Sequence, residues 1–227
     1  MEGVRAITLA LAHGWRVRAL AHSSERPLSA WAQGVVQRAG AEVHDTLPDA
    51  GMAELSDRHD RSELIAVLPI PADDPGRQQS RPDLCVVVID RPGLPGTLGS
   101  LLRSIDALGG HGLIVVGHAA DVYDPEVIRA STGSFFAVPV VQMERVPDVL
   151  AWRDSLRGAL GDVPLIGAAE DGAVDADAHP LSRAFLAACD HVVRIPMHGS
   201  ASSLNVAAAG SVLRYEVGRQ RRAGHST

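Results

Sequence analysis

The sequence predicts an α/β fold with a mostly parallel sheet. Continuous apolar runs such as 84–90 (LCVVVID) and 111–117 (HGLIVVG) are typical of strands buried on both faces of such a sheet. Segments with helical spacing alternate with these runs, and the connections between them are short. In the helix expected near residue 100, one face carries Leu98, Leu101, Leu102, Ile105 and Leu108. This alternation favours parallel strands that are joined by helices.

The first 70 residues already show this alternation. Val4, Ile7 and Leu11 have the spacing of one helix face and predict a helix at the start. The elements expected next are a strand at 16–23, a helix at 27–40, a strand at 41–46, a helix and loop at 51–61 and a strand at 63–70. Residues 71–83 (PADDPGRQQSRPD) contain three prolines and five charged residues, which indicates a linker.

The second part continues the pattern to the end of the chain. Its expected elements are a strand at 84–90, a turn and helix at 91–108, a strand at 111–117, a short helix that stops at Gly133, a strand ending at 141, a helix at 146–160, a strand at 163–169, a helix at 180–188, a strand at 190–197 and a helix from 203 to about 220. Ligands bind at the carboxyl ends of parallel strands, so we expect the loops after these strands to form the site.

Composition and charge exclude several classes of protein. A chain of 227 residues with 46% hydrophobic residues can bury a core, and its net charge of −6 argues against indiscriminate binding of nucleic acid. No apolar run approaches the roughly 20 residues that a membrane helix needs, and no signal peptide is visible. Cys85 and Cys189 lie in apolar runs and are expected to be buried, reduced thiols. A cytoplasmic protein without membrane contact is the default expectation.

Two glycine-containing segments are candidate ligand loops. Residues 91–99 (RPGLPGTLG) turn tightly into a helix, but they match neither the dinucleotide motif nor the P-loop. Arg103 follows in that helix and is, by sequence alone, either a surface arginine or a site residue. Residues 195–205 are rich in Gly, Ser and Ala, which lets a ligand approach the main chain closely. The last helix is expected to follow, opened by Ser203 and Asn205.

A third candidate is the group formed by Arg129, Ser131 and Thr132, just before Gly133. An arginine with neighbouring hydroxyl groups suits a phosphate. A glycine in this place also closes a helix, so a purely structural C-terminus is the competing interpretation. Elsewhere the ten histidines show no ligand spacing, so no metal is expected, and no Gly-x-Ser-x-Gly motif marks a nucleophile.

Two long segments resemble one family. Residues 90–141 (from DRPGLPGTLGSLLRS to VPVV) and 189–221 (from CDHVVRIPMHGSASSLN to GRQR) are similar to the first and third motifs of the SpoU/TrmH RNA ribose 2′-O-methyltransferases. These enzymes form part of the SPOUT class, which has a deep trefoil knot. The phrases GHAADVYDP and GSASSLN are shared with the actinobacterial branch of avilamycin-resistance type 23S rRNA methyltransferases.

The resemblance implies a domain organisation. Residues 1–70 correspond to a small RNA-recognition domain of the ribosomal protein L30e type, which begins late, as if truncated at its start. Residues 71–83 are then a linker, and residues 84–227 are the methyltransferase domain with its α/β knot. The resemblance also implies S-adenosylmethionine as cofactor, RNA as substrate with rRNA preferred over tRNA, and a homodimer formed through the knot region.

Individual site residues follow from the same resemblance. The positions matching catalytic residues are Arg103, Thr97, Ser203 and Asn205. The positions matching cofactor-binding residues are Ala168, Ile195, Pro196, Met197, Gly199, Ser203 and Leu204. The positions matching RNA-binding residues are Arg103, Arg129, Ser131 and Thr132. Arg103 matches an arginine that helps to deprotonate the ribose hydroxyl, which is too weak an acid to react unaided.

The sequence departs from the family pattern in two places. Thr97 stands where the first motif has an asparagine, so a hydroxyl replaces an amide. The second motif, a buried strand ending in Gly-Asn-Glu, is missing before Pro180, Leu181 and Ser182. Loss of that strand predicts an unpaired sheet edge and exposed apolar surface.

Three functional hypotheses therefore stay open at the level of sequence. The first is a working methyltransferase with a remodelled site. The second is an inactive relative that binds RNA or only dimerises, and the third is a binder of small molecules on an α/β scaffold. Binding of S-adenosylmethionine separates the first hypothesis from the other two.

Overall fold

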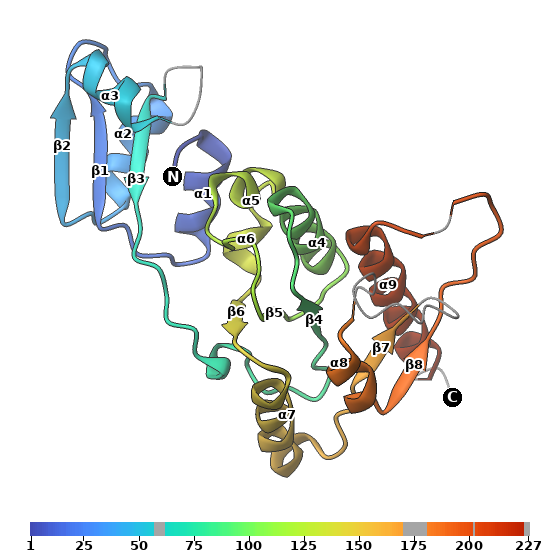
Figure 1. Ribbon diagram of the computed structural model, residues 1–227. Helices are drawn as coiled ribbons and strands as arrows, with labels where there is room; N and C mark the ends of the chain where they lie inside the picture. The colour runs from blue at the N-terminus through green and yellow to red at the C-terminus, as the bar shows by residue number, and fades with distance from the viewer. Residues whose placement is uncertain (57–61, 170–180, 202, 225–227) are drawn as a thin grey trace. The chain divides into compact units, whose positions relative to one another are not determined.

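The computed structural model alternates helices and strands along the whole chain (Figure 1), and it describes residues 1–56, 62–169, 181–201 and 203–224. The elements are α1 (Val4–Ala12), β1 (Ala19–Ser23), α2 (Ala30–Arg38), β2 (Val43–Leu47), α3 (Asp49–Leu55), β3 (Leu64–Val67), η1 (Pro75–Arg77), β4 (Val86–Asp90), α4 (Pro95–Ala107), β5 (Gly112–Val116), α5 (Pro125–Ala130), α6 (Ser134–Ala137), β6 (Val140–Met143), α7 (Val146–Leu160), β7 (Ile166–Ala168), α8 (Arg183–Ala188), β8 (His191–Val193) and α9 (Val206–Gly224). The predicted α/β class is confirmed.

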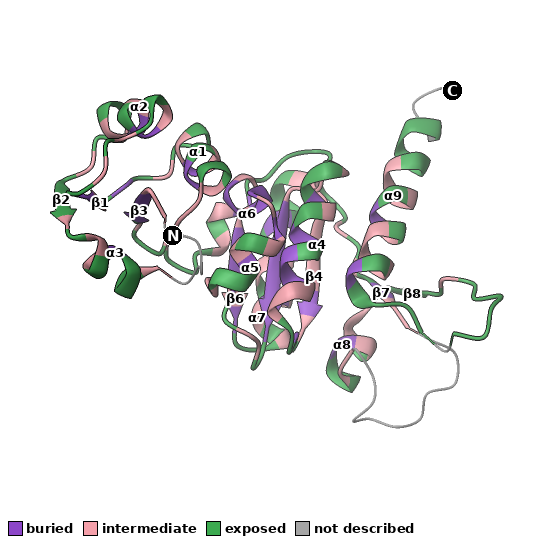
Figure 2. Ribbon diagram, turned by 90° about the horizontal axis from the view of Figure 1, so that it is seen from above, coloured by how far each residue is buried: buried purple, intermediate pink, exposed green. Residues whose placement is uncertain are grey.

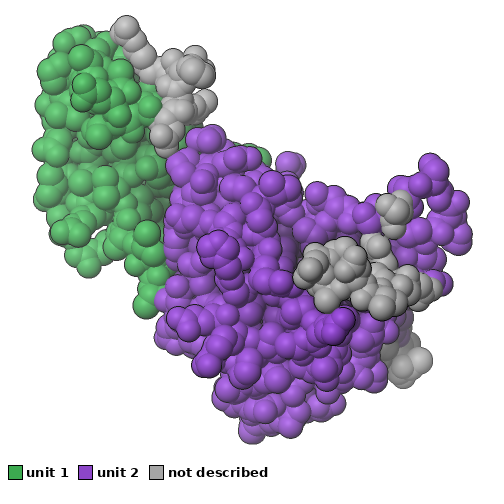
Figure 3. Space-filling view, in the orientation of Figure 1, with its two compact units in different colours: residues 1–72, 132–137 green, residues 73–131, 138–227 purple. Residues whose placement is uncertain are grey.

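The chain forms two compact units, coloured separately in Figure 3. Unit 1 consists of Met1–Ala72 and Thr132–Ala137, and unit 2 consists of Asp73–Ser131 and Val138–Thr227. This division differs from the predicted boundaries in two respects. The segment 132–137, which the sequence places in the methyltransferase part, packs in unit 1. Residues 73–83, which the sequence places in a linker, belong to unit 2.

Unit 1 has a three-stranded sheet in the order β2-β1-β3. Strand β1 pairs with β2 in parallel and with β3 antiparallel. The apolar faces of α1 and α2 pack on this sheet, and the core includes Ile7, Val17, Leu20, Val35 and Leu64. The Ser29 hydroxyl begins α2 by accepting a hydrogen bond from Ala32 N. The chain start lies on the outer edge of β3, where the amino group of Met1 donates to Ala66 O.

Unit 2 contains the parallel sheet β4-β5-β6. Every residue of β5 is buried, as expected for a central strand with helices on both faces (Figure 2). Ile114 and Val116 pack with Val149 of α7 and Phe185 of α8 on one face. Side chains alternate along a strand, so Leu113 and Val115 point to the opposite face.

The predicted linker is partly packed into this sheet. Gln78 is buried, and its Nε2 donates to Pro139 O at 3.0 Å. Arg77 Nη1 donates to Val140 O at 2.8 Å, and Asp73 Oδ1 accepts from Gln142 N at 2.9 Å. Residues 73–78 thus cover the beginning of β6 and hold it in place.

A second, two-stranded parallel sheet pairs β7 with β8. In the ranges that the structure describes, no strand pairs with the outer edge of β4, as the missing second motif predicts. Apolar side chains are exposed here: Ile166 is 50% exposed and Val192 is 54% exposed. Strand β8 also ends at Val193, earlier than the strand predicted for 190–197.

The segment before β6 contains an element that the sequence did not predict. Residues after Gly133 were expected to continue directly into a strand, but they first form α6. Thr132 and Gly133 both have left-handed φ angles, of +51° and +102°, which separate α5 from α6. No helix among the described residues is long and apolar enough to cross a membrane.

Candidate active site

The first predicted motif forms the turn from β4 into α4. Arg91 has a left-handed φ of +47°, which reverses the chain after Asp90. Pro95 opens α4, where the absence of an N–H group costs nothing, and the preceding Leu94 is 67% exposed. The motif therefore lies at the carboxyl edge of the parallel sheet, where the sequence placed the site.

Arg103 and Thr97 both lie on α4. Thr97 is half-buried in the first turn of α4, at the position where the family pattern has an asparagine. Arg103 is exposed, and within the described part of the chain no hydrogen bond or ion pair engages its guanidinium. A free guanidinium has N–H groups available to bind a phosphate or a developing oxyanion.

Asp90 and Ser182 form a link at this edge that the sequence did not reveal. The side chain of Asp90 is 4% exposed, and its Oδ1 lies 3.2 Å from Arg91 Nε. Its Oδ2 accepts a hydrogen bond from Ser182 N at 2.7 Å, and the Ser182 hydroxyl in turn begins α8. In the sequence, Asp90 could have been noticed as an acidic residue at the end of a buried strand. Ser182 lies 92 positions away, so no local pattern could identify it as the partner of Asp90.

The second part of the candidate site is the beginning of α9. Asn205 Oδ1 accepts a hydrogen bond from Ala207 N at 2.9 Å, which confirms the predicted cap of the last helix. Helix α9 packs on α4, with a hydrogen bond of 2.7 Å between the Ser211 and Ser104 hydroxyl groups. Further along both segments, Arg214 of α9 contacts Gly109, which follows the end of α4. The two helices are therefore parallel, and α9 begins beside the beginning of α4, which carries Thr97.

The predicted cofactor residues lie at the carboxyl ends of β7 and β8. Ala168 pairs with Val193 in the parallel register, and Ala169 N donates to Val193 O at 3.1 Å. From Val193 the chain continues into the segment that contains the other predicted cofactor residues, namely Ile195, Pro196, Met197, Gly199, Ser203 and Leu204. The strand pairing thus places Ala168 next to the start of this segment.

These residues fit a ligand with an apolar ring and a polar chain. Most of the segment is exposed, and a Cβ atom added to Gly199 would meet no atom within 4 Å. Met197 and Leu204 are each 38% exposed and offer apolar surface for an adenine ring. The main-chain groups of 195–201 form no hydrogen bond with another described residue, so they are available to polar atoms of a ligand. S-adenosylmethionine has both kinds of group.

The predicted RNA-binding residues differ from one another in accessibility. Arg129, at the end of α5, is exposed, and no described residue pairs with its guanidinium. Ser131 is 0% exposed and its hydroxyl donates to Ile128 O at 2.8 Å, an arrangement that does not favour a phosphate contact. The carbonyl of Thr132 accepts a hydrogen bond from Arg5 Nε at 2.5 Å. The helix C-terminus that competed with the phosphate interpretation is present, since α5 ends here.

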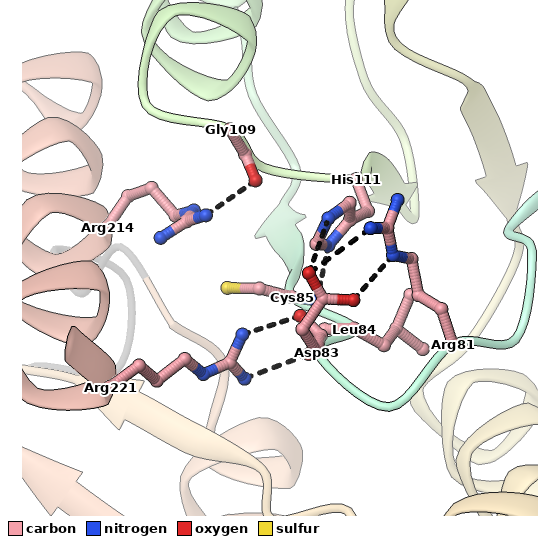
Figure 4. A network of polar contacts seen from close by, with 8 residues as sticks. All are labelled: Arg81, Asp83, Leu84, Cys85, Gly109, His111, Arg214 and Arg221. Carbon is pink, nitrogen blue, oxygen red and sulfur yellow. Dashed lines mark hydrogen bonds and ion pairs between the residues drawn. The ribbon is translucent and has the colours of Figure 1, made fainter. Parts of the chain in front are cut away.

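The arginine-rich end of α9 is engaged within the protein (Figure 4). Arg214 is 8% exposed and its Nη2 donates to Gly109 O at 2.5 Å. Arg221 donates to the main-chain oxygens of Asp83 and Leu84, at 2.5 and 3.0 Å. These contacts attach α9 to the start of β4. Arg214, which is buried and bonded to a main-chain oxygen, is therefore not available to a phosphate group of RNA.

Other charges in this region are paired as well. Arg219 binds Glu216 through two hydrogen bonds of 2.7 Å, and these lower the pKa of Glu216 to about 2. His111 Nδ1 accepts a hydrogen bond from Cys85 N at 3.0 Å, and its Nε2 lies 3.7 Å from Asp83 Oδ2. Burial lowers the pKa of His111, because the charged imidazolium loses solvation.

The described residues contain no group of three or more His, Cys, Asp or Glu side chains arranged for a metal ion. Cys85 and Cys189 are free thiols, and both are half-buried rather than buried. A cavity of about 140 Å³ is lined by Ser23, Arg26, Pro27, Leu28 and Glu63. It belongs to unit 1 and holds none of the predicted cofactor residues.

Two family patterns match the chain. The SpoU L30e-like domain matches residues 1–66, and the SpoU rRNA Methylase family matches residues 84–161 and 178–215. Over 99% of this chain and 83% of the relative, the sequence is 42% identical to a 23S rRNA (uridine(2479)-2′-O)-methyltransferase of Streptomyces viridochromogenes.

Solved structures show the same similarity. The SpoU methyltransferase AviRb of Streptomyces viridochromogenes, in complex with AdoMet, matches with a TM-score of 0.87 and 41% identity over 97% of this chain and 89% of AviRb. An RNA 2′-O ribose methyltransferase matches with a TM-score of 0.71 and 30% identity, over 97% of this chain and 87% of that structure.

Proposed function

The chain belongs to the SpoU rRNA Methylase family, and from this membership we propose that it methylates the ribose 2′-OH of structured RNA, with rRNA preferred over tRNA. The methyl donor is S-adenosylmethionine. The observation that carries the proposal is the 42% identity, across 99% of the chain, to an enzyme named for this reaction on 23S rRNA. The exposed guanidinium of Arg103 on α4, which no described residue pairs, supports it.

The chemistry requires help for a very weak acid. A ribose 2′-OH must lose its proton as its oxygen attacks the methyl carbon, and the negative charge that develops needs hydrogen-bond donors. Arg103 supplies such donors from an exposed position on α4. Guanidinium groups stay protonated in proteins, so its expected role is to stabilise the oxyanion and hold the adjacent phosphate while the proton passes to solvent.

S-adenosylmethionine supplies the activated methyl group. We assign its binding to the carboxyl ends of β7 and β8, with Ala168 and the segment from Ile195 to Gly199 as its residues. We assign Leu204 and the Ser203 hydroxyl to the same site, and Asn205 fixes the start of α9, which follows them. Arg129 is the second cation that we expect to hold RNA phosphate.

The proposal includes the domain organisation and the assembly. We assign RNA recognition to residues 1–70 and methyl transfer to residues 84–227, with 71–83 between them. We also infer a homodimer, because apolar side chains that are exposed in the single chain lie on β8 and α9: Val192, Val193, Val212 and Tyr215. A ribosomal RNA substrate implies action in the cytoplasm.

Arg103→Ala tests the proposed role. Methylation of 23S rRNA, measured as transfer of tritium from labelled S-adenosylmethionine, is expected to fall by about 100- to 1,000-fold, as for the loss of one oxyanion donor. Cofactor affinity by calorimetry should stay unchanged. Arg157→Ala is the matched control, since Arg157 is exposed on α7 and its guanidinium forms an ion pair with Asp154, away from α4. Unchanged transfer in Arg103→Ala would contradict the assignment.

A second candidate function is that of an inactive relative that binds RNA or only dimerises. The outer edge of β4, with which no described strand pairs, favours it, because the strand of the missing second motif forms one wall of the cofactor pocket in the family pattern. Titration of the wild-type protein with S-adenosylmethionine and S-adenosylhomocysteine decides between the two. Micromolar binding supports the enzyme, whereas no binding at millimolar cofactor supports the inactive relative.

A further inference from the structure

We propose that Trp15 of unit 1 is a positioning residue for methyl transfer, acting through the segment 132–137 on the helix that carries Arg103. This inference rests on the proposed function. The relevant feature is how the chain runs between α5 and β6. Helix α5 and strand β6 belong to unit 2, yet the segment that joins them packs in unit 1.

Trp15 holds this segment through its ring and its N–H group. Its Nε1 donates to Phe136 O at 3.0 Å. Its ring lies 5.3 Å from the ring of Phe136, in a T-shaped contact, and 5.7 Å from the ring of Phe135. Phe136 is 6% exposed and Phe135 is 2% exposed, so both are as buried as core residues. They lie in a connecting segment of only six residues.

A second attachment fixes the beginning of the segment to α1. Arg5 Nε donates to Thr132 O at 2.5 Å. Thr132 has a left-handed φ of +51°, which a threonine adopts only where surrounding contacts impose it. Leu9 covers Gly133 so closely that a Cβ atom there would lie 2.1 Å from Leu9 Cδ1. The place of the segment in unit 1 is thus defined at both ends.

On its other side the segment continues directly from α5, which packs tightly on α4. A Cβ atom on Gly99 would lie 2.5 Å from Ala130 Cβ and 2.6 Å from Val127 O, so the two helices meet main chain to main chain. Arg103 is four residues after Gly99, on the same face of α4 and one turn further along. A shift at the end of α5 therefore moves the support of the helix face that carries Arg103.

The consequence is a mechanical link from RNA recognition to the proposed catalytic residue. When unit 1 holds the segment, the end of α5 is fixed, and α5 in turn supports α4. Without Trp15 the segment loses its ring contacts and its hydrogen bond, and the end of α5 is free to move. Because misplacement by about 1 Å can cost on the order of 100-fold in rate, methyl transfer should depend on Trp15 although it touches no reacting atom.

The test compares Trp15→Ala with Trp31→Ala. Trp31 is also a half-buried tryptophan of unit 1, but its Nε1 donates to Thr8 Oγ1, at 3.1 Å, within the unit. For methylation of 23S rRNA, kcat is expected to fall by about 100-fold in Trp15→Ala and by no more than about 3-fold in Trp31→Ala. The affinity for S-adenosylmethionine should stay unchanged in both variants. Trp15→Phe, which keeps a ring but not the N–H group, should restore part of kcat.

Hydrogen–deuterium exchange of the full-length variants separates this inference from the proposed function. Faster exchange in α4 and α5 in Trp15→Ala, but not in Trp31→Ala, is expected whether or not the protein methylates RNA. Equal exchange in the two variants, or an equal loss of kcat, would overturn the inference and leave Trp15 a purely structural residue. A wild-type protein without transferase activity would refute the proposed function, and the exchange result would still decide the mechanical link.

Discussion

Valines occur in both parallel sheets of unit 2, but full burial is found in the central strand β5 and not in β8. In β5, Val115 and Val116 are 1% and 2% exposed, whereas in β8 Val192 and Val193 are 54% and 37% exposed. The strands have similar composition, so composition does not cause the difference. Strand β5 has a strand on each side and helices on both faces, while β8 pairs only with β7 among the described residues.

The comparison shows how each region is held in place. The β4-β5-β6 sheet is stabilised by burial, because apolar side chains on both of its faces are removed from contact with water. The last part of the chain is instead attached through α9, by the Ser211–Ser104 hydrogen bond and by Arg214 and Arg221. The proposed cofactor surface thus lies on the less buried of the two regions. Exposed main-chain and apolar groups are what a ligand or a second subunit requires.

The largest expected effect is on the free energy of unfolding, when one valine in β5 and one in β8 are each replaced by alanine. Val115→Ala removes buried methyl groups and leaves a cavity, so the free energy of unfolding should fall by about 2–3 kcal/mol. Val192→Ala, the matched change at an exposed position, should lower it by no more than about 0.5 kcal/mol. Urea unfolding of both variants measures the difference. Similar losses would show that β8 is buried in the protein in solution, as a subunit contact would require.

An intermediate effect is expected at the two helices that pack on α4. Gly99→Ala brings a Cβ atom to 2.6 Å from Val127 O, a main-chain atom that cannot yield, and should cost about 1–2 kcal/mol. At Gly210 the atom met is the flexible Leu101 Cδ1, also at 2.6 Å. Gly210→Ala should therefore change stability by less than about 1 kcal/mol, since the better helix propensity of alanine offsets the contact. Equal losses at both positions would mean that α9 is packed as rigidly as α5.

Local sequence patterns predicted most elements of the fold, because such patterns depend only on residues a few positions apart in the chain. The apolar face of α4 and the continuous apolar run of β5 are examples, and both formed where expected. The same reasoning missed α6. Phe135 and Phe136 are residue types common in strands, and their place in unit 1 depends on distant contacts such as the one with Trp15, some 120 positions earlier.

The candidate site was predictable only in part, for the same reason. The cap by Asn205 is a local interaction and was found from the sequence. The burial of Arg214 was not, because the carbonyl that it binds lies 105 positions away. Asp90 and Gln78 were missed similarly, since each has a distant partner and neither belongs to a recognisable motif. The roles of the predicted cofactor residues stay predictions that rest on family resemblance.

The smallest effect concerns the polar network that joins the two regions, shown in Figure 4. His111, just before β5, is close to Arg81, Asp83, Arg214 and Arg221. Burial lowers its pKa below the ordinary value of 6.5, and the arginines add to the effect, while the Asp83 carboxylate opposes it. The unfolded chain therefore takes up this proton first as the pH falls below 6.5, so the folded state should lose stability there.

NMR titration of the His111 ring measures this directly, with His111→Asn to assign the signal. Asparagine can still accept the hydrogen bond from Cys85 N, so this variant should keep the network while its unfolding free energy declines less between about pH 7 and pH 5. Asp83→Asn removes a nearby negative charge that favours the imidazolium and should lower the pKa of His111 further. A pKa at or above 6.5 in the wild type would contradict the prediction that burial and the arginines outweigh the Asp83 carboxylate at this ring.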